Sequence, residues 1–562
     1  MDYKTLAEVY EDLESTTKKL KKAEIIANYI KKIPSKLLPK VILLLTGKIF
    51  PTWSEEVTGV ARQLMIKAIA KATGTSEKDI LKKFTSSGDL GKTAEHFIKA
   101  KKQRTLASKK LSIREVFEDL QKIARLEGKG SQDQKINLIA GLLSHASTKE
   151  ALYIVRTVLG ELRVGVAEGI VRDSIAQAYG LDKKDVERAY QLHPDYGEVA
   201  AIAKEKGKTG LKQAKIKPGM PVVVLLAEKS PDLKTALEAF EHPILEYKYD
   251  GMRIVIHKKG DKFWLFTRRL ENVSKAFPDM IKLCKKAIKA KECIIDCEAL
   301  GIDPKTKMPL PFQALSTRIK RKYDIEKAMK ELSIQMNLFD ILYLNGKNLM
   351  DLPLKERQVI LKKSVKQIKG KFQLAKHLIT KDLKKADAFY KQALHAGQEG
   401  LIVKNLDAKY VSGRRVAGGW LKVKPVMETL DLAIIGATWG AGKRAGWLGS
   451  LVLGCREDGK YLKCGMLGTG IKEKITKEGD VTFAALTKML KPYITEEKGN
   501  TVKIKPKIII EVAYEEIQKS PTYDSGFALR FPRFIRLRPD KKYADDTTRI
   551  KKLYKQQKGK RK

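Results

Sequence analysis

The stretch Leu245-Glu246-Tyr247-Lys248-Tyr249-Asp250-Gly251-Met252-Arg253-Ile254 determines how the chain is interpreted. Residues two apart on a strand share a face, so Glu246, Lys248 and Asp250 are predicted to point the same way. Asp-Gly predicts a tight turn, after which Arg253 begins a returning strand. A lysine held among carboxylates and an arginine is a candidate nucleophile, because burial or nearby cations lower the pKa of an amine. A solvated hairpin of mixed charges is the alternative, and this stretch alone leaves both interpretations open.

The sequence around this stretch, from about residue 216 to 426, has the pattern of a mixed α/β domain. Helical patterns such as Leu383–Ala396 separate short apolar segments. Strands are predicted at Ile254–His257, Phe263–Thr267, Ile294–Ala299, Met336–Leu342, Leu401–Lys404 and Trp420–Val423.

The flanking regions differ from this centre. Residues 1–215 are predicted to be helical, because apolar residues recur at helical spacing. The segment Leu162–Gly169 interrupts that spacing with glycines beside Arg163, which suits either a phosphate backbone or tight packing. Residues 427–562 have the strand and glycine pattern of a small barrel, with one helix near Phe483–Leu490 and a basic tail. We therefore expect three domains: 1–215, 216–426 and 427–562.

The charge of the chain indicates a polyanionic partner. It has 112 Lys and Arg against 66 Asp and Glu, a net charge of +46. A lysine-rich proteome from a hot or salty habitat is the alternative, but a thermophile signature raises glutamate together with lysine. Five cysteines form no C-x-x-C pair, so no zinc site is expected. Cys455 and Cys464 flank a predicted hairpin and could face each other.

Targeting features are not recognisable in the sequence. No apolar run reaches the length of a membrane span, and the first residues lack a signal-peptide pattern. We expect a cytoplasmic protein associated with the nucleoid and reduced thiols.

Further charged and aromatic residues lie at the ends of the central predicted strands. Phe339 stands on a buried strand, where plain core packing is the alternative. Strict alternation predicts that Lys422 and Lys424 share one face. The other candidates are Arg268 after one strand, Glu298 near the end of another and Glu399 before a third.

Together these residues suit phosphoryl-type chemistry on a nucleotide. Cations neutralise a triphosphate, carboxylates hold a divalent metal, and an aromatic ring stacks on a base. No Walker A loop is present, because the glycine-rich stretch Gly436–Arg444 has the wrong spacing and lacks Ser or Thr after Lys443. Phosphate binding is therefore expected from side chains.

Lys-Tyr-Asp-Gly-Met-Arg at 248–253 resembles the K-x-D-G-x-R signature of covalent nucleotidyltransferases, and the other segments follow in that superfamily's order. The whole chain resembles an ATP-dependent DNA ligase of the archaeal type. The resemblance implies a helical DNA-binding domain, a mixed α/β adenylation domain and a C-terminal OB-fold. It also implies sealing of 3′-OH/5′-phosphate nicks with ATP, through a lysyl-AMP and a DNA-adenylate, in DNA replication, repair and recombination.

The resemblance assigns the adenylation-domain residues as follows. Lys248 attacks the α-phosphate of ATP, and the backbone at Glu246 helps to recognise adenine, on which Phe339 stacks. The remaining contacts to ribose, phosphates, the nick terminus or metal fall to Arg253, Arg268, Glu298, Glu399, Lys422 and Lys424, with Glu298 and Glu399 as the metal carboxylates.

Two further assignments concern less regular matches. Either Arg414 or Arg415 stands for the family's arginine before Lys422, because this sequence carries an extra residue between them. The terminal motif, with Arg538, Asp540 and Lys541, contacts the triphosphate in the first step. The implied cofactors are ATP and Mg²⁺, with Mn²⁺ as a substitute.

The implied partner is nicked double-stranded DNA, bound by a monomer. Archaeal relatives often carry a sliding-clamp motif where this chain has Gln103–Ala107, which keeps the glutamine but lacks the aromatic pair. An RNA ligase or a capping guanylyltransferase shares the lysine motif but usually lacks the helical domain. An NAD-dependent ligase would carry a zinc module, and a non-catalytic nucleic-acid-binding protein would not need every charged motif residue.

Overall fold

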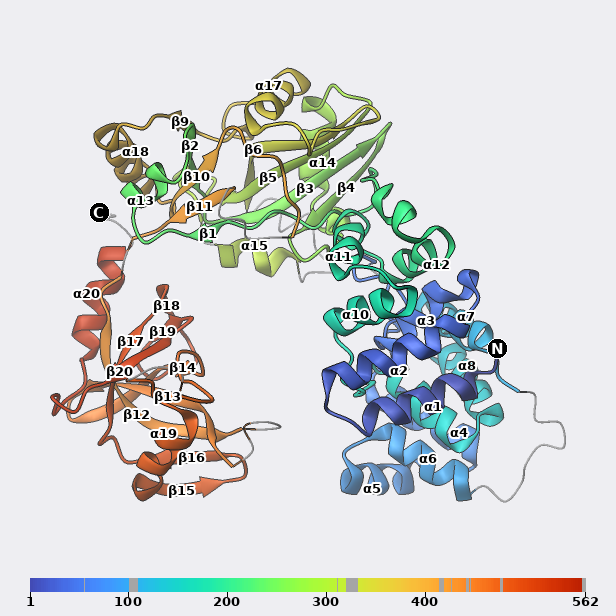
Figure 1. Ribbon diagram of the computed structural model, residues 1–562. Helices are drawn as coiled ribbons and strands as arrows, with labels where there is room; N and C mark the ends of the chain where they lie inside the picture. Colours follow the sequence, from blue (N-terminus) through green and yellow to red (C-terminus); the bar gives the residue numbers. More distant parts are fainter. Residues whose placement is uncertain are drawn as a thin grey trace. The chain divides into compact units, whose positions relative to one another are not determined.

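The structure, a computed structural model, describes residues 1–54, 56–100, 110–310, 312–319, 332–413, 419–425, 427–440, 444, 446–475 and 479–557. Contacts divide the chain into two compact units (Figure 1). The first comprises Met1–Ala386 with Ile402–Lys422, and the second comprises Asp387–Leu401 with Val423–Lys562. Across the described ranges, no helix combines the length and apolarity that a membrane crossing needs.

The N-terminal region is helical, as the sequence predicts. Its core is one cluster of buried apolar side chains, and every residue of α9 from Glu150 onward is buried. The helices are α1 (Tyr3–Glu14), α2 (Lys19–Lys32), α3 (Leu38–Leu45), α4 (Arg62–Thr73), α5 (Glu77–Ser87), α6 (Leu90–Ala100), α7 (Ile113–Arg125), α8 (Ser131–His145), α9 (Thr148–Val158), α10 (Glu168–Tyr179), α11 (Lys183–Leu192) and α12 (Tyr196–Lys212).

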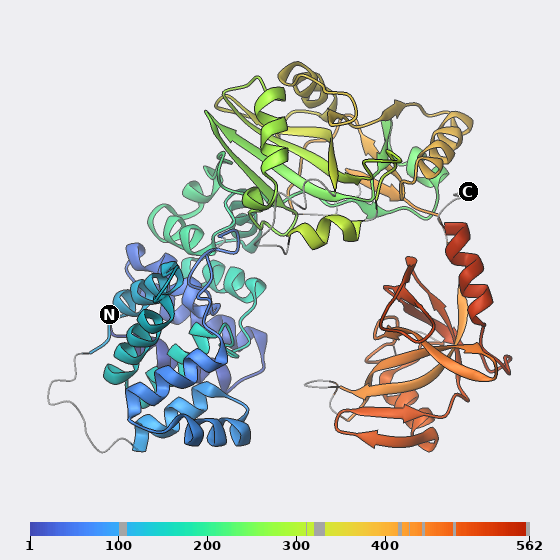
Figure 2. The same cartoon turned by 180° about the vertical axis from the view of Figure 1, so that it is seen from behind.

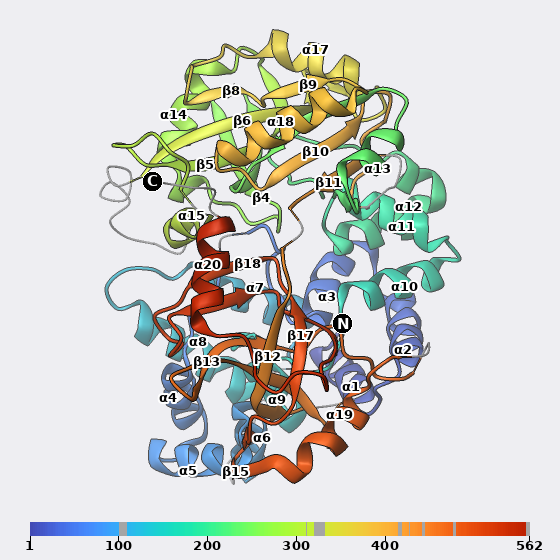
Figure 3. The ribbon, with the colours of Figure 1, turned by 90° about the vertical axis from the view of Figure 1, so that its left-hand side faces the viewer.

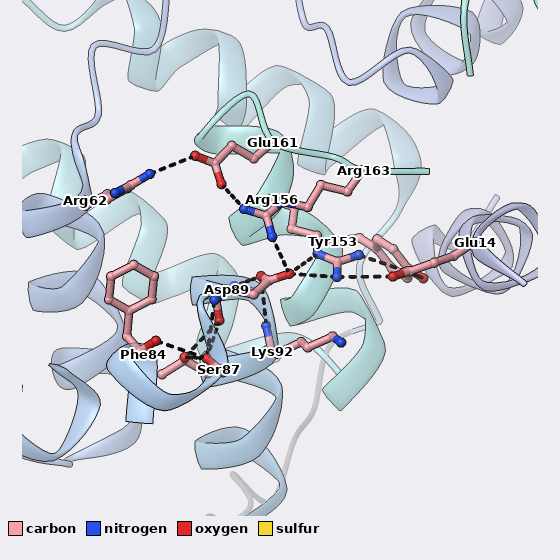
Figure 4. A network of polar contacts seen from close by, with 12 residues as sticks. Glu14, Arg62, Phe84, Ser87, Asp89, Lys92, Tyr153, Arg156, Glu161 and Arg163 are labelled. Atoms are coloured by element: carbon pink, nitrogen blue, oxygen red, sulfur yellow. Dashed lines mark hydrogen bonds and ion pairs between the residues drawn. The ribbon is translucent and has the colours of Figure 1, made fainter. Parts of the chain in front are cut away.

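A polar network fixes the loop between α9 and α10 (Figure 4). Arg156 on α9 pairs with Asp89 at 2.8 Å and with Glu14 at 2.9 Å, so its buried guanidinium is satisfied. Arg163 in the loop, with φ 61°, reaches the same Asp89 carboxylate at 3.5 Å. Lys22 of α2 donates to the Val164 carbonyl. Side chains from several helices therefore hold the glycine-containing loop that the sequence singles out.

The central region is built on two sheets (Figure 1). The five-stranded sheet has the order β1 (Glu228–Lys229), β11 (Trp420–Val423), β10 (Gly400–Asn405), β2 (Pro243–Lys248), β9 (His377–Ile379). The six-stranded sheet has the order β4 (Lys262–Thr267), β3 (Met252–Lys259), β5 (Glu292–Ile302), β6 (Ser333–Leu344), β7 (Lys347–Asn348), with β8 (Phe372–Leu374) beside β6.

Helices cover these sheets. The helix α14 (Pro278–Ala287) buries Met280 and Cys284 against the six-stranded sheet, and its green ribbon lies in front of the strands in Figure 2. The other helices are α13 (Leu233–Glu238), α15 (Phe312–Ile319), α17 (Leu354–Ser364) and α18 (Leu383–His395). All six predicted strands and the helix predicted at Leu383–Ala396 are found, so the mixed α/β pattern is confirmed.

The hairpin predicted at Asp250-Gly251 is wrong. β2 and β3 do not pair with each other but belong to different sheets. Gly251 passes so close to β5 that a Cβ there would lie 2.4 Å from the Ala299 carbonyl oxygen. The segment is a crossover, which leaves Lys248 at the end of one sheet and starts the other sheet near Arg253.

The C-terminal region is rich in strands, as expected. The central strand β12 (Leu430–Trp439) pairs with β13 (Leu448–Glu457), β16 (Thr501–Ile504) and β17 (Ile509–Ala513). The sheet continues through β14 (Lys460–Leu467), β15 (Ile494–Lys498) and β20 (Arg533–Leu537), with β18 (Glu516–Lys519) and β19 (Phe527–Arg530) as a separate pair. Among the described strands the pairing path stays open, in an arrangement compatible with the expected OB-fold.

Two α-helices accompany the strands in the described part of this region. The helix α19 (Phe483–Leu490) spans the residues predicted for it. The helix α20 (Thr547–Gln557) lies beside β18, where Gln557 accepts from the backbone of Ile517 (Figure 3). The predicted basic tail is thus helical as far as Gln557. Cys455 on β13 and Cys464 on β14 are both buried and form no disulfide, and their thiols donate to the carbonyls of Leu462 and Leu453.

Candidate active site

Lys248 ends a buried strand. Residues Pro243–Tyr247 of β2 are buried, and Lys248 is the first residue of the strand to reach partial exposure. β2 lies between β10 and β9, so strands on both sides fix the backbone that carries the amine. The position suits a nucleophile, because a rigid element holds it at the border between interior and solvent.

A row of polar residues crosses the neighbouring sheet. Arg253 on β3 lies directly opposite Glu298 on β5, and Glu298 lies opposite the buried Asn337 on β6. Directly opposite residues share a face of the sheet. Arg268 follows Thr267, the partner of Ile254, and therefore reaches the same end of the sheet. The structure brings Arg253, Arg268 and Glu298 together where the crossover from Lys248 enters.

Arg253 is held by protein groups. Its Nε and Nη2 donate to the two Asp296 oxygens at 3.0 and 2.6 Å, and Nη1 donates to the Leu225 carbonyl at 2.7 Å. Tyr410 donates to Asp296 Oδ2 at 3.0 Å and lies 3.2 Å from Arg253 Nη2. Burial lowers the pKa of the guanidinium, but Asp296 and Tyr410 outweigh it and raise the pKa above its ordinary value.

Aromatic rings from the two sheets meet above this arginine. Phe339 of β6 is edge-to-face with Trp420 of β11, with centroids 5.7 Å apart. The guanidinium carbon of Arg253 lies 5.4 Å from the Phe339 centroid and 5.1 Å from that of Trp420. Both rings therefore contact the same cation.

Glu246 and Lys404 form a buried ion pair beside these rings. Glu246 Oε2 lies 2.6 Å from Lys404 Nζ, and Gln358 Nε2 donates to Oε1 at 3.1 Å. Burial raises the pKa of the Glu246 carboxyl, and Lys404 partly offsets that rise. The carboxylate of Glu246, and not only its backbone, thus has a defined position.

The residues before β10 and after β11 form a second polar pair. Lys424 Nζ lies 2.6 Å from Glu399 and 3.6 Å from Glu515. A Cβ on Gly400 would lie 2.2 Å from the Val423 carbonyl oxygen, so only glycine lets the backbone of these segments approach so closely. Along β11, Lys422 is partly exposed between the buried Leu421 and Val423, as the alternation predicts.

The terminal motif residues bind acids of the C-terminal region. Arg538 donates to Asp431 at 2.8 Å and to Asp540 at 2.9 Å, and Lys541 lies 3.6 Å from Asp431. Arg538 holds the pKa of Asp540 down at about 2. The three residues predicted for this motif therefore include a preformed arginine–carboxylate pair.

Known proteins match the chain from end to end. The family model described as "DNA ligase N terminus" matches residues 2–176, "ATP dependent DNA ligase domain" matches 224–424, and "ATP dependent DNA ligase C terminal region" matches 444–541. The DNA ligase of Nanoarchaeum equitans is 46% identical, over 100% of this chain and 99% of that protein. That of Thermococcus onnurineus is 43% identical, over 99% and 98%. The chain belongs to the ATP-dependent DNA ligases.

A solved structure shares the ligase fold. The chain titled "Pmar-Lig_PreS3" superposes with a TM-score of 0.52 at 16% identity, over 95% of this ligase and 99% of that chain. This structure and the family models confirm the expected fold class, and the family models and full-length relatives confirm the ligase activity and the use of ATP.

Some predicted positions of the ligase lie outside the described residues. Arg414 and Arg415 fall in 414–418, and the clamp-motif stretch Gln103–Ala107 falls in 101–109. The choice between the two arginines therefore stays as the sequence leaves it.

Sequence reasoning missed four residues that the structure places in contact with the candidate residues: Asp296, Lys404, Tyr410 and Trp420. Asp296 and Lys404 did carry a signal, because each interrupts an otherwise apolar strand with a charge. A buried charge needs a partner, and its presence in such a strand predicts one. Tyr410 lies in a loop and carried no comparable signal.

Proposed function

We propose that this ligase seals nicks through an AMP carried on Lys248. The amine, after losing a proton, attacks the α-phosphorus of ATP, so that an N–P bond forms and pyrophosphate leaves. The observation that carries the proposal is the position of Lys248, where the end of β2 crosses to the sheet of Arg253 and Glu298.

The AMP then passes to the 5′-phosphate at the nick, and the 3′-hydroxyl displaces it to form the phosphodiester bond. The net charge of +46 suits a partner with a phosphate backbone, since basic residues release counterions from DNA. We infer that the protein acts as a monomer on nicked duplex DNA.

The nucleotide site that we propose uses residues from several strands. Glu246 lies beside the adenine base, and Phe339 stacks on that base. Arg253 in turn contacts the ring of Phe339. The phosphates and ribose are assigned to Arg268, Glu298, Lys422, Lys424 and one of Arg414 and Arg415. Arg538, Asp540 and Lys541 would orient the pyrophosphate in the first step.

The carboxylates of Glu298 and Glu399 suit Mg²⁺. The ion is usually held by one or two carboxylates together with substrate phosphates, so it needs no dedicated cage. No group of three or more His, Cys, Asp or Glu side chains that could hold a metal occurs in the described ranges. Glu298 and Glu399 would hold the ion, which neutralises phosphate charge when bound.

We assign these tasks to three domains: residues 1–215 for DNA binding, 216–426 for adenylation and 427–562 as the OB-fold. The decisive experiment is a sealing assay with ATP, Mg²⁺ and a duplex that carries one nick. The proposal is wrong if nicked DNA is not joined, or if the protein seals while no covalent AMP-protein can be trapped.

A further inference from the structure

Lys404 is a buried lysine to which the proposed mechanism gives no role. Only 1% of the residue is exposed, on the central strand β10. Its Nζ lies 2.6 Å from Glu246, 4.4 Å from the centroid of Phe339 and 4.2 Å from that of Trp420. Nζ has no well-aligned hydrogen bond to any described residue, so the carboxylate and the two ring faces balance its charge. This arrangement is costly to build for packing alone.

The ionisation of the Glu246 carboxyl group is linked to Lys404. The carboxyl is 3% exposed, and it precedes Lys248 by two residues on the same face of β2. Burial raises its pKa, Lys404 lowers it, His377 of β9 lowers it further, and Asp340 of β6 raises it. His377 is exposed and Asp340 is already paired with Arg357, so among the described groups Lys404 contributes most to lowering the pKa of Glu246.

The charge of Glu246 decides which hydrogen bonds it makes. An ionised carboxylate only accepts hydrogen bonds, whereas a protonated one also donates. Adenine presents an amino donor on its six-membered ring where guanine presents a carbonyl acceptor. A fixed, ionised carboxylate therefore accepts a hydrogen bond from the adenine amino group, whereas it repels the guanine carbonyl. A buried site rejects a ligand that leaves its polar groups unpaired.

We propose that Lys404 is a positioning residue for purine selection, which holds Glu246 as an acceptor-only carboxylate so that adenine is accepted and guanine rejected. The inference rests on the proposed nucleotide site, in which Glu246 lies beside the base. Gln358 contributes by fixing the second carboxylate oxygen.

The test is self-labelling of the full chain, without DNA, by ATP or GTP labelled at the α-phosphate. The measured quantity is the ratio of kcat/KM for the two nucleotides, between about pH 5.5 and 8.5. For Lys404→Met we expect this ratio to fall about 10-fold or more at low pH and to recover as pH rises through the raised pKa of Glu246. Lys404→Arg keeps the charge and should restore the ratio of the unmodified protein.

Two further variants sharpen the test. Glu246→Gln adds a donor and removes the charge, so selectivity should fall equally at every pH. Lys135→Met changes another buried lysine, whose Nζ donates to the Thr58 carbonyl at 2.8 Å in the helical region, and should leave the ratio unchanged.

The proposal is overturned if Lys404→Met slows labelling by both nucleotides equally at every pH. If that variant does not fold, as judged by circular dichroism, an unchanged ratio in Glu246→Gln overturns it instead. Failure of the proposed function is a separate outcome, because then ATP would not label the unmodified protein, or Lys248→Ala would still be labelled.

Discussion

Asp296 accepts two hydrogen bonds from Arg253, at 3.0 and 2.6 Å, in a position where the carboxylate has no exposed surface. The pair joins β5 to β3 at the end of the six-stranded sheet where the crossover from Lys248 arrives. The guanidinium of Arg253 thus contacts the rings of Phe339 and Trp420 while it is bonded to Asp296.

Asp296→Ala should lower the free energy of unfolding by about 3 to 5 kcal/mol, because it leaves the buried Arg253 charge without its carboxylate. Denaturant unfolding measures the change. Asp261→Ala, in the exposed turn between β3 and β4, is the matched control and should stay within about 0.5 kcal/mol. A loss below about 1 kcal/mol for Asp296→Ala would show that Leu225 and Tyr410 suffice to hold Arg253.

Lys248→Ala should abolish covalent labelling of the protein by α-labelled ATP, because the variant lacks the amine proposed to form the N–P bond. Denaturing gel electrophoresis of the labelled protein measures the adenylate. Lys259→Ala, at the exposed far end of β3, is the control and should label normally. A persistent adenylate in Lys248→Ala would assign the nucleophile to another residue.

Glu399→Ala should raise the Mg²⁺ concentration required for half-maximal self-labelling by about 10-fold or more, while binding of nicked DNA persists. The expectation follows from the loss of one oxygen ligand and of the partner of Lys424. Metal titration of the labelling rate and a DNA gel-shift assay measure the two effects. Glu238→Ala on α13 is the control, and an unchanged metal requirement in Glu399→Ala would remove Glu399 from the metal site.

Acid should destabilise the first unit partly through His257. The side chain is fully buried, Gly219 donates to its Nδ1 at 3.3 Å, and burial lowers its pKa to about 3. The unfolded histidine, with a pKa near 6.5, binds the proton first, so stability is full above about pH 6.5 and falls toward pH 3.

His257→Gln keeps an acceptor but does not titrate, and it should reduce the slope of unfolding free energy against pH in that window by up to about 1.4 kcal/mol per pH unit. Denaturant unfolding at several pH values measures the slope. His145→Gln, an exposed histidine of α8, should leave it unchanged. Equal slopes for His257→Gln and the unmodified protein would mean that the buried ring does not couple to acid unfolding.

Most elements of this ligase follow from local patterns. Short apolar segments located β3, β4, β5, β6 and β10, strict alternation located β11, and helical spacing located α18 and α19. Such patterns succeed because each element buries apolar side chains, whatever it packs against. The motif order also identified Lys248, Glu298 and Glu399 as a set, although no local pattern joins them.

Pairing between strands was not predictable in the same way. Asp250-Gly251 has the composition of a hairpin turn, and only the close approach of Gly251 to Ala299 shows that the chain crosses to another sheet. Residues such as Asp and Gly indicate that the backbone can turn, but they do not indicate which strand will pair with which.

The sequence by itself determined that Glu246 and Lys248 share a strand, that the partner is a polyanion, and the order of the charged segments. Only the tertiary structure decided which charges meet: Arg253 with Asp296, and Lys404 with Glu246 between two aromatic rings. The physical reason is that a buried charge needs a partner. That partner lies on whichever strand the fold brings close, and the separation of two residues in the sequence does not predict it.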